Sequence, residues 1–219
     1  MASRGETPPT DCEASRDKSN HEGITGASIT RGLLRRLQFR PIKRHLGERT
    51  AHALFTFVAG TLSIAVLAAV AAVARSPFIF PSLGPTAYLL FHRPLASASS
   101  PRNTLTGHLI GALCGWAALA AFGLLGAPDV LSAGVTWAHV GAAAFSLGLT
   151  GGLMAFFRVG HPPAGATTLI VSLGLMPYLW QIPILMLAVC LLTLLGFSIN
   201  RLPGIDYPIW SPPPASPGN

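Results

Sequence analysis

Two short segments rich in Pro, Gly and Thr carry the side chains best suited to contact a solute. They are residues 81–86, PSLGPT, and residues 161–168, HPPAGATT. Proline lacks a backbone N–H and obstructs a continuing helix, whereas glycine allows tight turns or the close approach of a ligand. Broken backbone at membrane depth survives only inside protein or beside a wet cavity. We therefore predict that both segments line a central substrate-binding site, with these residues: Pro81, Ser82, Gly84, Pro85, Thr86, His161, Pro162, Pro163, Gly165, Thr167 and Thr168.

The chemistry expected of such a site is the binding of a small anion. A helix that restarts after a break presents free N–H groups and the positive end of its dipole, which together attract anions. Pro162 and Pro163 suit the first turn of a restarting helix, and the hydroxyls of Thr86, Thr167 and Thr168 follow at once as donors. In the alternative interpretation the prolines only shape helix packing, and the threonines bond to the backbone one turn earlier.

Histidines add a second kind of chemistry. His161 opens the second broken segment, and histidine often serves as a proton relay or substrate contact within membranes. Arg158 lies three residues earlier, so an interfacial histidine at the membrane edge is the alternative. His52, His108 and His139 fall near the ends of the apolar runs and are predicted to be interfacial or packing residues.

The sequence carries no signature of an enzyme. No HExxH, GxSxG, GxxxxGK[ST] or CxxCH motif occurs, and Asp129 is the only acid between residues 50 and 200. We therefore expect no catalytic residues. The three cysteines are far apart and form no CxxC, so neither a metal site, a cofactor nor a disulfide framework is expected: Cys12, Cys114 and Cys190.

Charge placement identifies the elements that must hold these segments. Half of the 219 residues are apolar, only 11% are charged, and residues 50–200 contain five formal charges. Such depletion suits a lipid bilayer, not a water-soluble fold. The net charge of +7 does not indicate nucleic-acid binding, because seven of the fifteen basic residues lie between Arg31 and Arg49, just before the first apolar run.

The apolar pattern predicts an all-α polytopic membrane protein. Four long runs can each cross about 30 Å of hydrocarbon as a helix: residues 51–74, 105–127, 133–157 and 182–199. Two apolar segments broken by Pro and Gly, residues 76–91 and 161–181, lie between them. Residues 1–28 are predicted to be a disordered polar tail, 29–49 a basic juxtamembrane segment, 50–200 the transmembrane domain, and 201–219 a Pro-rich tail. The basic segment is either an interfacial helix or a solvated lead-in.

Arginine positions favour six crossings over four crossings with two re-entrant loops. The basic block predicts a cytoplasmic N-terminus. If both broken segments cross, Arg93, Arg102, Arg158 and Arg201 all face the cytoplasm, and only Arg75 lies outside. This arrangement agrees better with the excess of basic residues that cytoplasmic loops carry.

An internal repeat accompanies this topology. The Pro, Gly and Thr of PSLGPT match those of residues 162–167 at an offset of 81, which also superposes the first long run on most of the third. With three crossings in each half, the halves would form a 3+3 inverted repeat of the kind found in transporters. Chance is the alternative, because the chain is rich in Gly and Pro. Glycines at every fourth position, Gly107, Gly111 and Gly115 and then Gly148 and Gly152, predict close helix packing.

The second broken segment also resembles a known family signature. Residues 161–167, HPPAGAT, are similar to the motif that names the HPP family of integral membrane proteins. Supporting matches are SLGPTA at 82–87, PRN at 101–103 and GH at 107–108, and the resemblance extends from about residue 49 to residue 200. It implies four membrane spans, fewer than the six favoured above, and it associates plastid and cyanobacterial members with nitrite transport.

Two functions follow as hypotheses. The first is a transporter or channel for a small anion, with nitrite as the candidate that the resemblance implies. The second is a structural or assembly subunit of a membrane complex, in which the breaks only shape packing. A transport role needs the two broken segments to converge on a polar cavity. The expected partners are the lipid bilayer, a small anion and a further copy of the chain, with no nucleic acid, and the expected location is the bacterial inner membrane.

Overall fold

The computed structural model describes residues 47–76 and 78–211, and every regular element within them is helical. The predicted tail 1–28, most of the basic segment 29–49, Pro77 and the end of the Pro-rich tail lie outside the described residues. The predicted domain boundaries therefore stay predictions. The all-α fold is confirmed for the part of the chain that the structure describes.

Four long helices form the frame. They are α3 (Glu48–Ala74), α5 (Pro101–Ala121), α7 (Trp137–Phe156) and α9 (Gln181–Arg201), each long and apolar enough to cross a membrane. The side chain of Ser100 caps α5, so this helix begins four residues before the predicted run. Thr136 and His139 form a capping box at the start of α7. Residues 130–133, partly assigned to that run by the sequence, form a separate short helix, α6 (Val130–Ala133).

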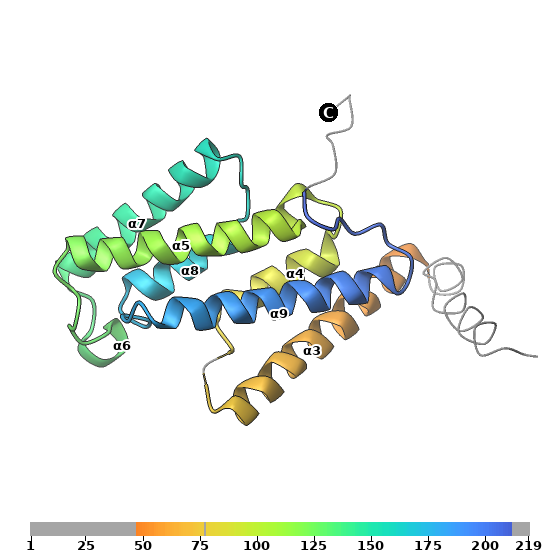
Figure 1. The fold of residues 1–219 in the computed structure, drawn as a ribbon, viewed down its shortest axis with the longest axis horizontal. Helices are drawn as coiled ribbons and strands as arrows, with labels where there is room; N and C mark the ends of the chain where they lie inside the picture. The colour runs from red at the N-terminus through yellow and green to blue at the C-terminus, as the bar shows by residue number, and fades with distance from the viewer. Residues whose placement is uncertain (1–46, 77, 212–219) are drawn as a thin grey trace, which may run out of the picture. The chain divides into compact units, whose positions relative to one another are not determined.

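The two broken segments form half-length helices. These are α4 (Leu83–His92) and α8 (Pro163–Ser172), with ten residues each. At 1.5 Å per residue each is about 15 Å long, half the hydrocarbon thickness. A short 3-10 turn, η1 (Ser97–Ser99), joins α4 to α5. Figure 1 shows α4 and α8 beside α5, at different positions along it.

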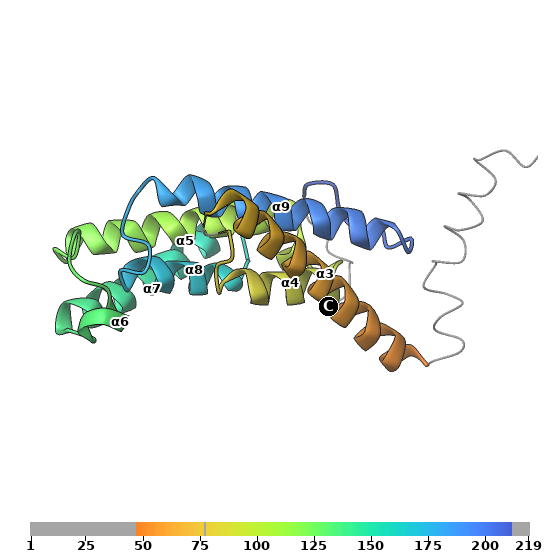
Figure 2. The ribbon, with the colours of Figure 1, turned by 90° about the horizontal axis from the view of Figure 1, so that it is seen from below.

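The half-helices run in opposite directions along α5. α4 ends at the start of α5, where the Ser99 hydroxyl donates to the Leu89 carbonyl. α8 starts beside Gly107 of α5 and reaches Gly115 with Val171, so it runs toward the end of α5. Both therefore begin near the same level of α5 and diverge from it (Figures 1 and 2).

The chain reverses along the bundle at each half-helix. α9 ends beside the start of α5, because the Tyr207 hydroxyl donates to the Ser99 carbonyl and the Arg102 N–H to the Trp210 carbonyl. α7 starts beside the end of α5, with Gly141 against Phe122. α7 and α9 thus share one direction, and α8 takes the chain back between them. This order of directions agrees with the six-crossing interpretation, in which four of the passes are full-length helices. The 3+3 inverted repeat stays a prediction.

Both reversals begin at an arginine in the left-handed conformation. Arg75 follows α3 with φ 48° and Arg158 follows α7 with φ 53°, and they are the only non-glycine residues with positive φ in the described ranges. A left-handed residue at this position ends a helix by bonding its N–H back to the last turn. The Arg75 N–H does so, to the Ala71 carbonyl.

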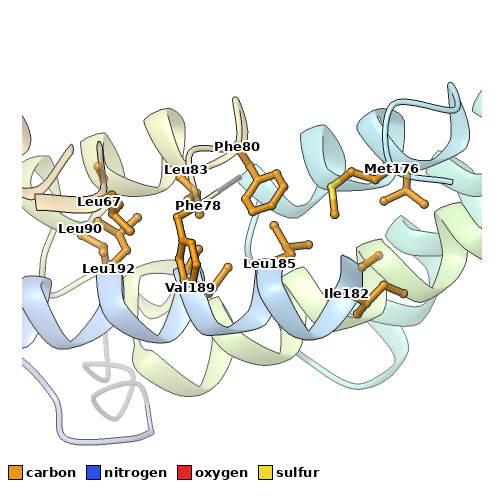
Figure 3. Close-up of a cluster of buried hydrophobic side chains, with 14 of the residues drawn as sticks. Leu67, Phe78, Phe80, Leu83, Leu90, Met176, Ile182, Leu185, Val189 and Leu192 are labelled. Carbon is orange, nitrogen blue, oxygen red and sulfur yellow. The ribbon is translucent and has the colours of Figure 1, made fainter. Parts of the chain in front are cut away.

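The apolar core extends through the bundle, and one part of it lies between α3, α4 and α9. Leu67 of α3, Leu83 and Leu90 of α4, and Val189 and Leu192 of α9 are buried there. Figure 3 shows these side chains packed together, with Phe78 and Phe80 from the segment before α4 beside them. Large apolar side chains also cover outer surfaces, as expected for helices that face lipid: Phe57, Val73, Trp137, Phe156 and Leu194.

Candidate functional site

The start of α8 explains why its prolines are there. Pro163 is the first helical residue, where a missing N–H costs nothing, as the sequence predicted. The Ala164 N–H bonds to the His161 carbonyl, and the Gly165 N–H bonds to the Pro162 carbonyl. The expectation of free N–H groups is therefore wrong for these two residues, because the turn before the helix already satisfies them.

The start of α4 is more open. The Leu83 N–H bonds to the Phe80 carbonyl, and Ser82 precedes the helix without a side-chain cap. Gly84 has no neighbour within 4 Å of a built Cβ, and Pro85 is exposed. This helix start therefore presents backbone and a proline ring outward.

A glycine face on α5 brings α8 close. A Cβ built on Gly107 would lie 2.7 Å from Cβ of His161, one on Gly111 would lie 2.6 Å from the Ala164 carbonyl, and one on Gly115 would lie 2.7 Å from Cβ of Val171. Real Cβ atoms do not come this close, so these glycines are needed for the contact. The predicted packing role is confirmed for this face of α5. Gly148 and Gly152 of α7 do not share this role with the described residues, because a Cβ built on either would have no neighbour within 4 Å there.

His108 of α5 is the centre of a buried polar cluster that joins both half-helices. Its Nε2 lies 2.9 Å from the Thr86 hydroxyl of α4, and its Nδ1 lies 2.7 Å from the Thr167 hydroxyl of α8. His161 places its Nε2 3.2 Å from Nε2 of His108 and its Nδ1 2.7 Å from the Ala98 carbonyl. The four side chains are at most 1% exposed. We call these four side chains the junction cluster.

The hydrogen bonds of the junction cluster fix where its protons lie. The Ala98 carbonyl can only accept, so the His161 ring donates through Nδ1 and accepts at Nε2. His108 then donates from Nε2, and its Nδ1 accepts from the Thr167 hydroxyl. These tautomers are inferred from the network. Every ring nitrogen is satisfied with both imidazoles neutral, so the cluster adds no charge to the interior.

The threonines agree in part with the packing alternative. The hydroxyl of Thr86 donates to the Ser82 carbonyl, and that of Thr168 lies within 3.2 Å of the Ala164 carbonyl, each one turn earlier. Both hydroxyls also reach across to another helix. Thr168 lies 2.8 Å from the hydroxyl of Thr150 on α7 and 3.0 Å from the Gly111 carbonyl. These threonines therefore connect helices in addition to bonding within their own helix.

A pocket of about 340 Å³ opens between the first turns of the two half-helices. Pro85, Tyr88 and Leu89 of α4 form one wall. Pro162, Pro163 and Ala166 of α8 form the other, and we call this space the junction pocket. Its lining is apolar, and the junction cluster lies outside it.

The structure brings the two predicted segments together through α5. Five of the predicted site residues are exposed or half-buried around the first turns: Pro81, Gly84, Pro85, Pro162 and Gly165. The other six are buried: Ser82, Thr86, His161, Pro163, Thr167 and Thr168. The predicted substrate role of these eleven residues stays a prediction, because no ligand contact tests it.

Sequence reasoning missed the centre of the cluster. His108 is fully buried, so of the two roles predicted for it, interfacial or packing, the structure favours packing, and His161 is fully buried beside it. His139 does cap the start of α7, and His52 pairs with His92 near the end of α4. The available signal was the Gly107-His108 pair. Its glycine lets α8 approach, and its histidine meets that helix.

The described residues contain no group of three or more His, Cys, Asp or Glu side chains that could hold a metal ion. No charged side chain belongs to the junction cluster either. The chemistry it offers is hydrogen bonding among neutral groups. Both half-helices also direct the positive ends of their dipoles toward this level of the bundle.

Comparison with known proteins gives one match. The family model described as "HPP, transmembrane region" matches residues 47–208, which include all four long helices and both half-helices. No curated protein and no solved structure matches the chain. Because the match covers most of the chain, this integral membrane protein belongs to the HPP transmembrane family.

Proposed function

We propose that this chain is a transporter or channel that moves a small anion across the membrane through the junction of α4 and α8. The observation that carries the proposal is the meeting of two oppositely directed half-helices at a buried polar cluster. Polar side chains within a membrane are costly and usually mark a solute or proton path. Discontinuous helices whose first turns meet near mid-depth are a recurrent way of building such a path.

Nitrite is the first solute to test. The sequence resemblance associates some family members with it, and a small monovalent anion suits two converging positive helix ends. The junction cluster is closed in this state, since each ring nitrogen is already bonded. Passage of an anion would therefore require the junction pocket to open toward Thr86 and His161, and a proton-linked step would use the histidine pair.

The direct test is nitrite uptake by proteoliposomes that contain the purified protein, compared with empty vesicles. We expect uptake above the empty vesicles, and a Thr86→Val variant should lower the maximal rate by about tenfold or more if the hydroxyl contacts the passing anion. Thr193→Val is the matched control. Thr193 is also buried, but its hydroxyl bonds only to the Val189 carbonyl of its own helix.

The second hypothesis, a structural subunit of a membrane complex, also has an observation in its favour. The junction cluster is buried and each of its ring nitrogens is bonded, and a network of this kind can act purely to hold helices together. It predicts no uptake of nitrite or related anions above empty vesicles. If the Thr86→Val and Thr193→Val variants take up nitrite at equal maximal rates, the junction is not on the transport path.

A further inference from the structure

A second pocket, of about 530 Å³, lies between α3 and α4 near the start of α3. Its α3 wall follows one helix face at spacings of three and four residues. Its α4 wall consists of Tyr88 and His92, one turn apart. The α3 wall is formed by Arg49, His52, Ala53, Thr56 and Phe57.

The polar groups in this pocket are held in place by one another. His52 lies with Nε2 3.0 Å from the His92 carbonyl and 3.2 Å from Nδ1 of His92. The carbonyl can only accept, so His52 Nε2 donates to it. The Tyr88 ring stacks on the His92 ring at 4.8 Å between centroids, with an angle of 16° between the planes. The two imidazoles and the phenol therefore form one connected group that joins the α3 wall to the α4 wall.

Arg49 is the one charged side chain in the lining of the pocket. The first turn of α3 directs the positive end of the helix dipole to this end, and Glu48 in the same turn carries one negative charge. The C-terminal carbonyl of α4 at His92 would repel an anion, but His52 already donates to it.

One hydroxyl in the lining has no partner. The Oγ1 atom of Thr56 is shielded from solvent and makes no hydrogen bond in the described residues. A buried hydroxyl without a partner costs free energy. Because solvent does not reach this atom, a bound oxyanion would accept from it only after the Thr56 side chain rotates toward the pocket.

The pocket adjoins the junction pocket. Tyr88 lines both, and about two turns of α4 separate His92 from Pro85 in the wall of the junction pocket. A solute held near Arg49 would therefore reach the first turns of α4 and α8 by passing Tyr88. The side chain of Tyr88 is 56% exposed, so little packing opposes its movement.

We propose that the pocket formed by Arg49, His52, Thr56, Tyr88 and His92 is a binding site for a small oxyanion and is the vestibule of the junction. Most of its lining surface is apolar, the Arg49 guanidinium and the Tyr88 phenol are its main donors, and no carboxylate is among the lining residues. The vestibule role rests on the proposed transport function, whereas the binding itself does not. An anionic lipid headgroup presents similar oxygens, so the tests must separate it from a free anion.

The first experiment is the concentration dependence of nitrite uptake. Arg49→Gln should raise the KM for nitrite about fivefold with little change in the maximal rate, because capture is weakened and the junction is intact. Arg49→Lys should restore most of the affinity. Arg93→Gln is the matched control, since Arg93 is exposed at the same end of α4 but lies outside the pocket. An equal change in both glutamine variants, or an unchanged KM in Arg49→Gln, overturns the site.

Changing the lipid composition tests whether Arg49 binds a free anion or an anionic lipid headgroup. The same variants are compared in vesicles of phosphatidylcholine alone and of phosphatidylcholine mixed with phosphatidylglycerol. A KM effect of Arg49→Gln in both supports a site for the free anion. An effect confined to the vesicles with phosphatidylglycerol assigns Arg49 to a lipid headgroup and overturns the proposal.

Binding can be measured without transport. In the full chain in neutral nanodiscs, NMR signals of isotope-labelled histidine rings are followed during titration with nitrite. His52 and His92 should shift saturably in the wild type and much less in Arg49→Gln, while His139 stays unchanged. Saturable shifts without nitrite uptake would support the binding site and overturn the transport function. Nitrite uptake without such shifts would support transport and overturn the binding site.

Discussion

The two half-helices have the same length but are held in different ways. α8 packs along its length against α5, where three glycines admit it, and its C-terminal end is tied by the bond from the Val130 N–H to the Leu173 carbonyl. α4 packs one face into the core, with Leu83 and Thr86 buried in its first turn, and its last carbonyls are bonded by Ser99 at Leu89 and Asn200 at Leu90. Its first turn is open around Gly84.

The difference assigns the two helices different mechanical roles. A helix clamped by close backbone contact along its length serves as a fixed wall, whereas one with an open face at its first turn has more room to move. The first turn of α4 is tied to the bundle through Thr86 and the buried Leu83. If the junction opens, we expect α4 to move and α8 to stay in place. Four measurements test this comparison.

The largest effect is expected at the residue that joins both helices. His108→Ala removes the partner of Thr86, Thr167 and His161 and leaves a cavity, so it should destabilise the protein by about 3–5 kcal/mol. Thermal unfolding in detergent measures the loss. His139→Ala, which removes only a cap at the start of α7, should cost about 1 kcal/mol. Similar losses in the two variants would show that the cluster does not join the helices.

The contrast between clamped and open helices is tested by matched glycine changes. Gly111→Ala places a Cβ 2.6 Å from the Ala164 carbonyl and 2.8 Å from the Thr168 hydroxyl, and should destabilise by about 1–3 kcal/mol. Gly84→Ala meets open space in a helix and should be neutral or stabilise by up to about 1 kcal/mol. The measurement is the unfolding midpoint of each variant. A lower midpoint for Gly84→Ala than for Gly111→Ala would refute the assignment of α8 as the clamped helix.

A smaller effect is expected at the threonine that connects α8 to α5 and α7. Thr168→Val keeps the shape but removes bonds to the Gly111 carbonyl and the Thr150 hydroxyl, at a cost of about 1–2 kcal/mol. Thr193→Val loses only a bond within α9 and should cost less. Hydrogen exchange of the α8 amides should rise in the first variant alone. Unchanged protection would mean that glycine packing suffices to fix α8.

The smallest effect concerns the exposed turn that ties the end of α8. The N–H groups of Leu131 and Ser132 donate to the Asp129 carboxylate and hold its pKa below the usual 3.8. A lowered pKa in the folded state contributes stability that is present above the unfolded value and is lost as the pH falls through the folded value. Asp129→Ala should therefore be slightly less stable than the wild type above about pH 5, with the difference shrinking as the pH falls below about 4 and disappearing only below the lowered pKa of the folded state. A difference independent of pH would contradict a role for the carboxylate charge.

The sequence predicted the long helices well because a membrane imposes long apolar runs. Each predicted run overlaps one of the four long helices. The errors lie at the ends, where Ser100 and Asp129 act as caps that hydropathy does not register. Pro162 and Pro163 were correctly placed at a helix start, because proline chemistry is local.

The centre of the site was harder to predict because its partners are distant along the chain. His108 bonds to residues 22, 53 and 59 positions away. A single histidine in an apolar run gives no sign of such partners. The glycine spacing on α5 predicted close packing but not which helix would fill it, and the same spacing at Gly148 and Gly152 has no neighbour in this chain.

The placement of charge has an electrical consequence. The charged residues in the described ranges all lie at or beyond helix ends: Glu48, Arg49, Arg75, Arg93, Arg102, Asp129, Arg158, Arg201 and Asp206. The interior, with neutral histidines at its centre, holds no formal charge on which a membrane potential could act. A potential of 100 mV does about 2.3 kcal/mol of work on each elementary charge that crosses. In the proposed transport that work would fall on the solute and any accompanying proton, so voltage would set the direction of flux without shifting the resting protein.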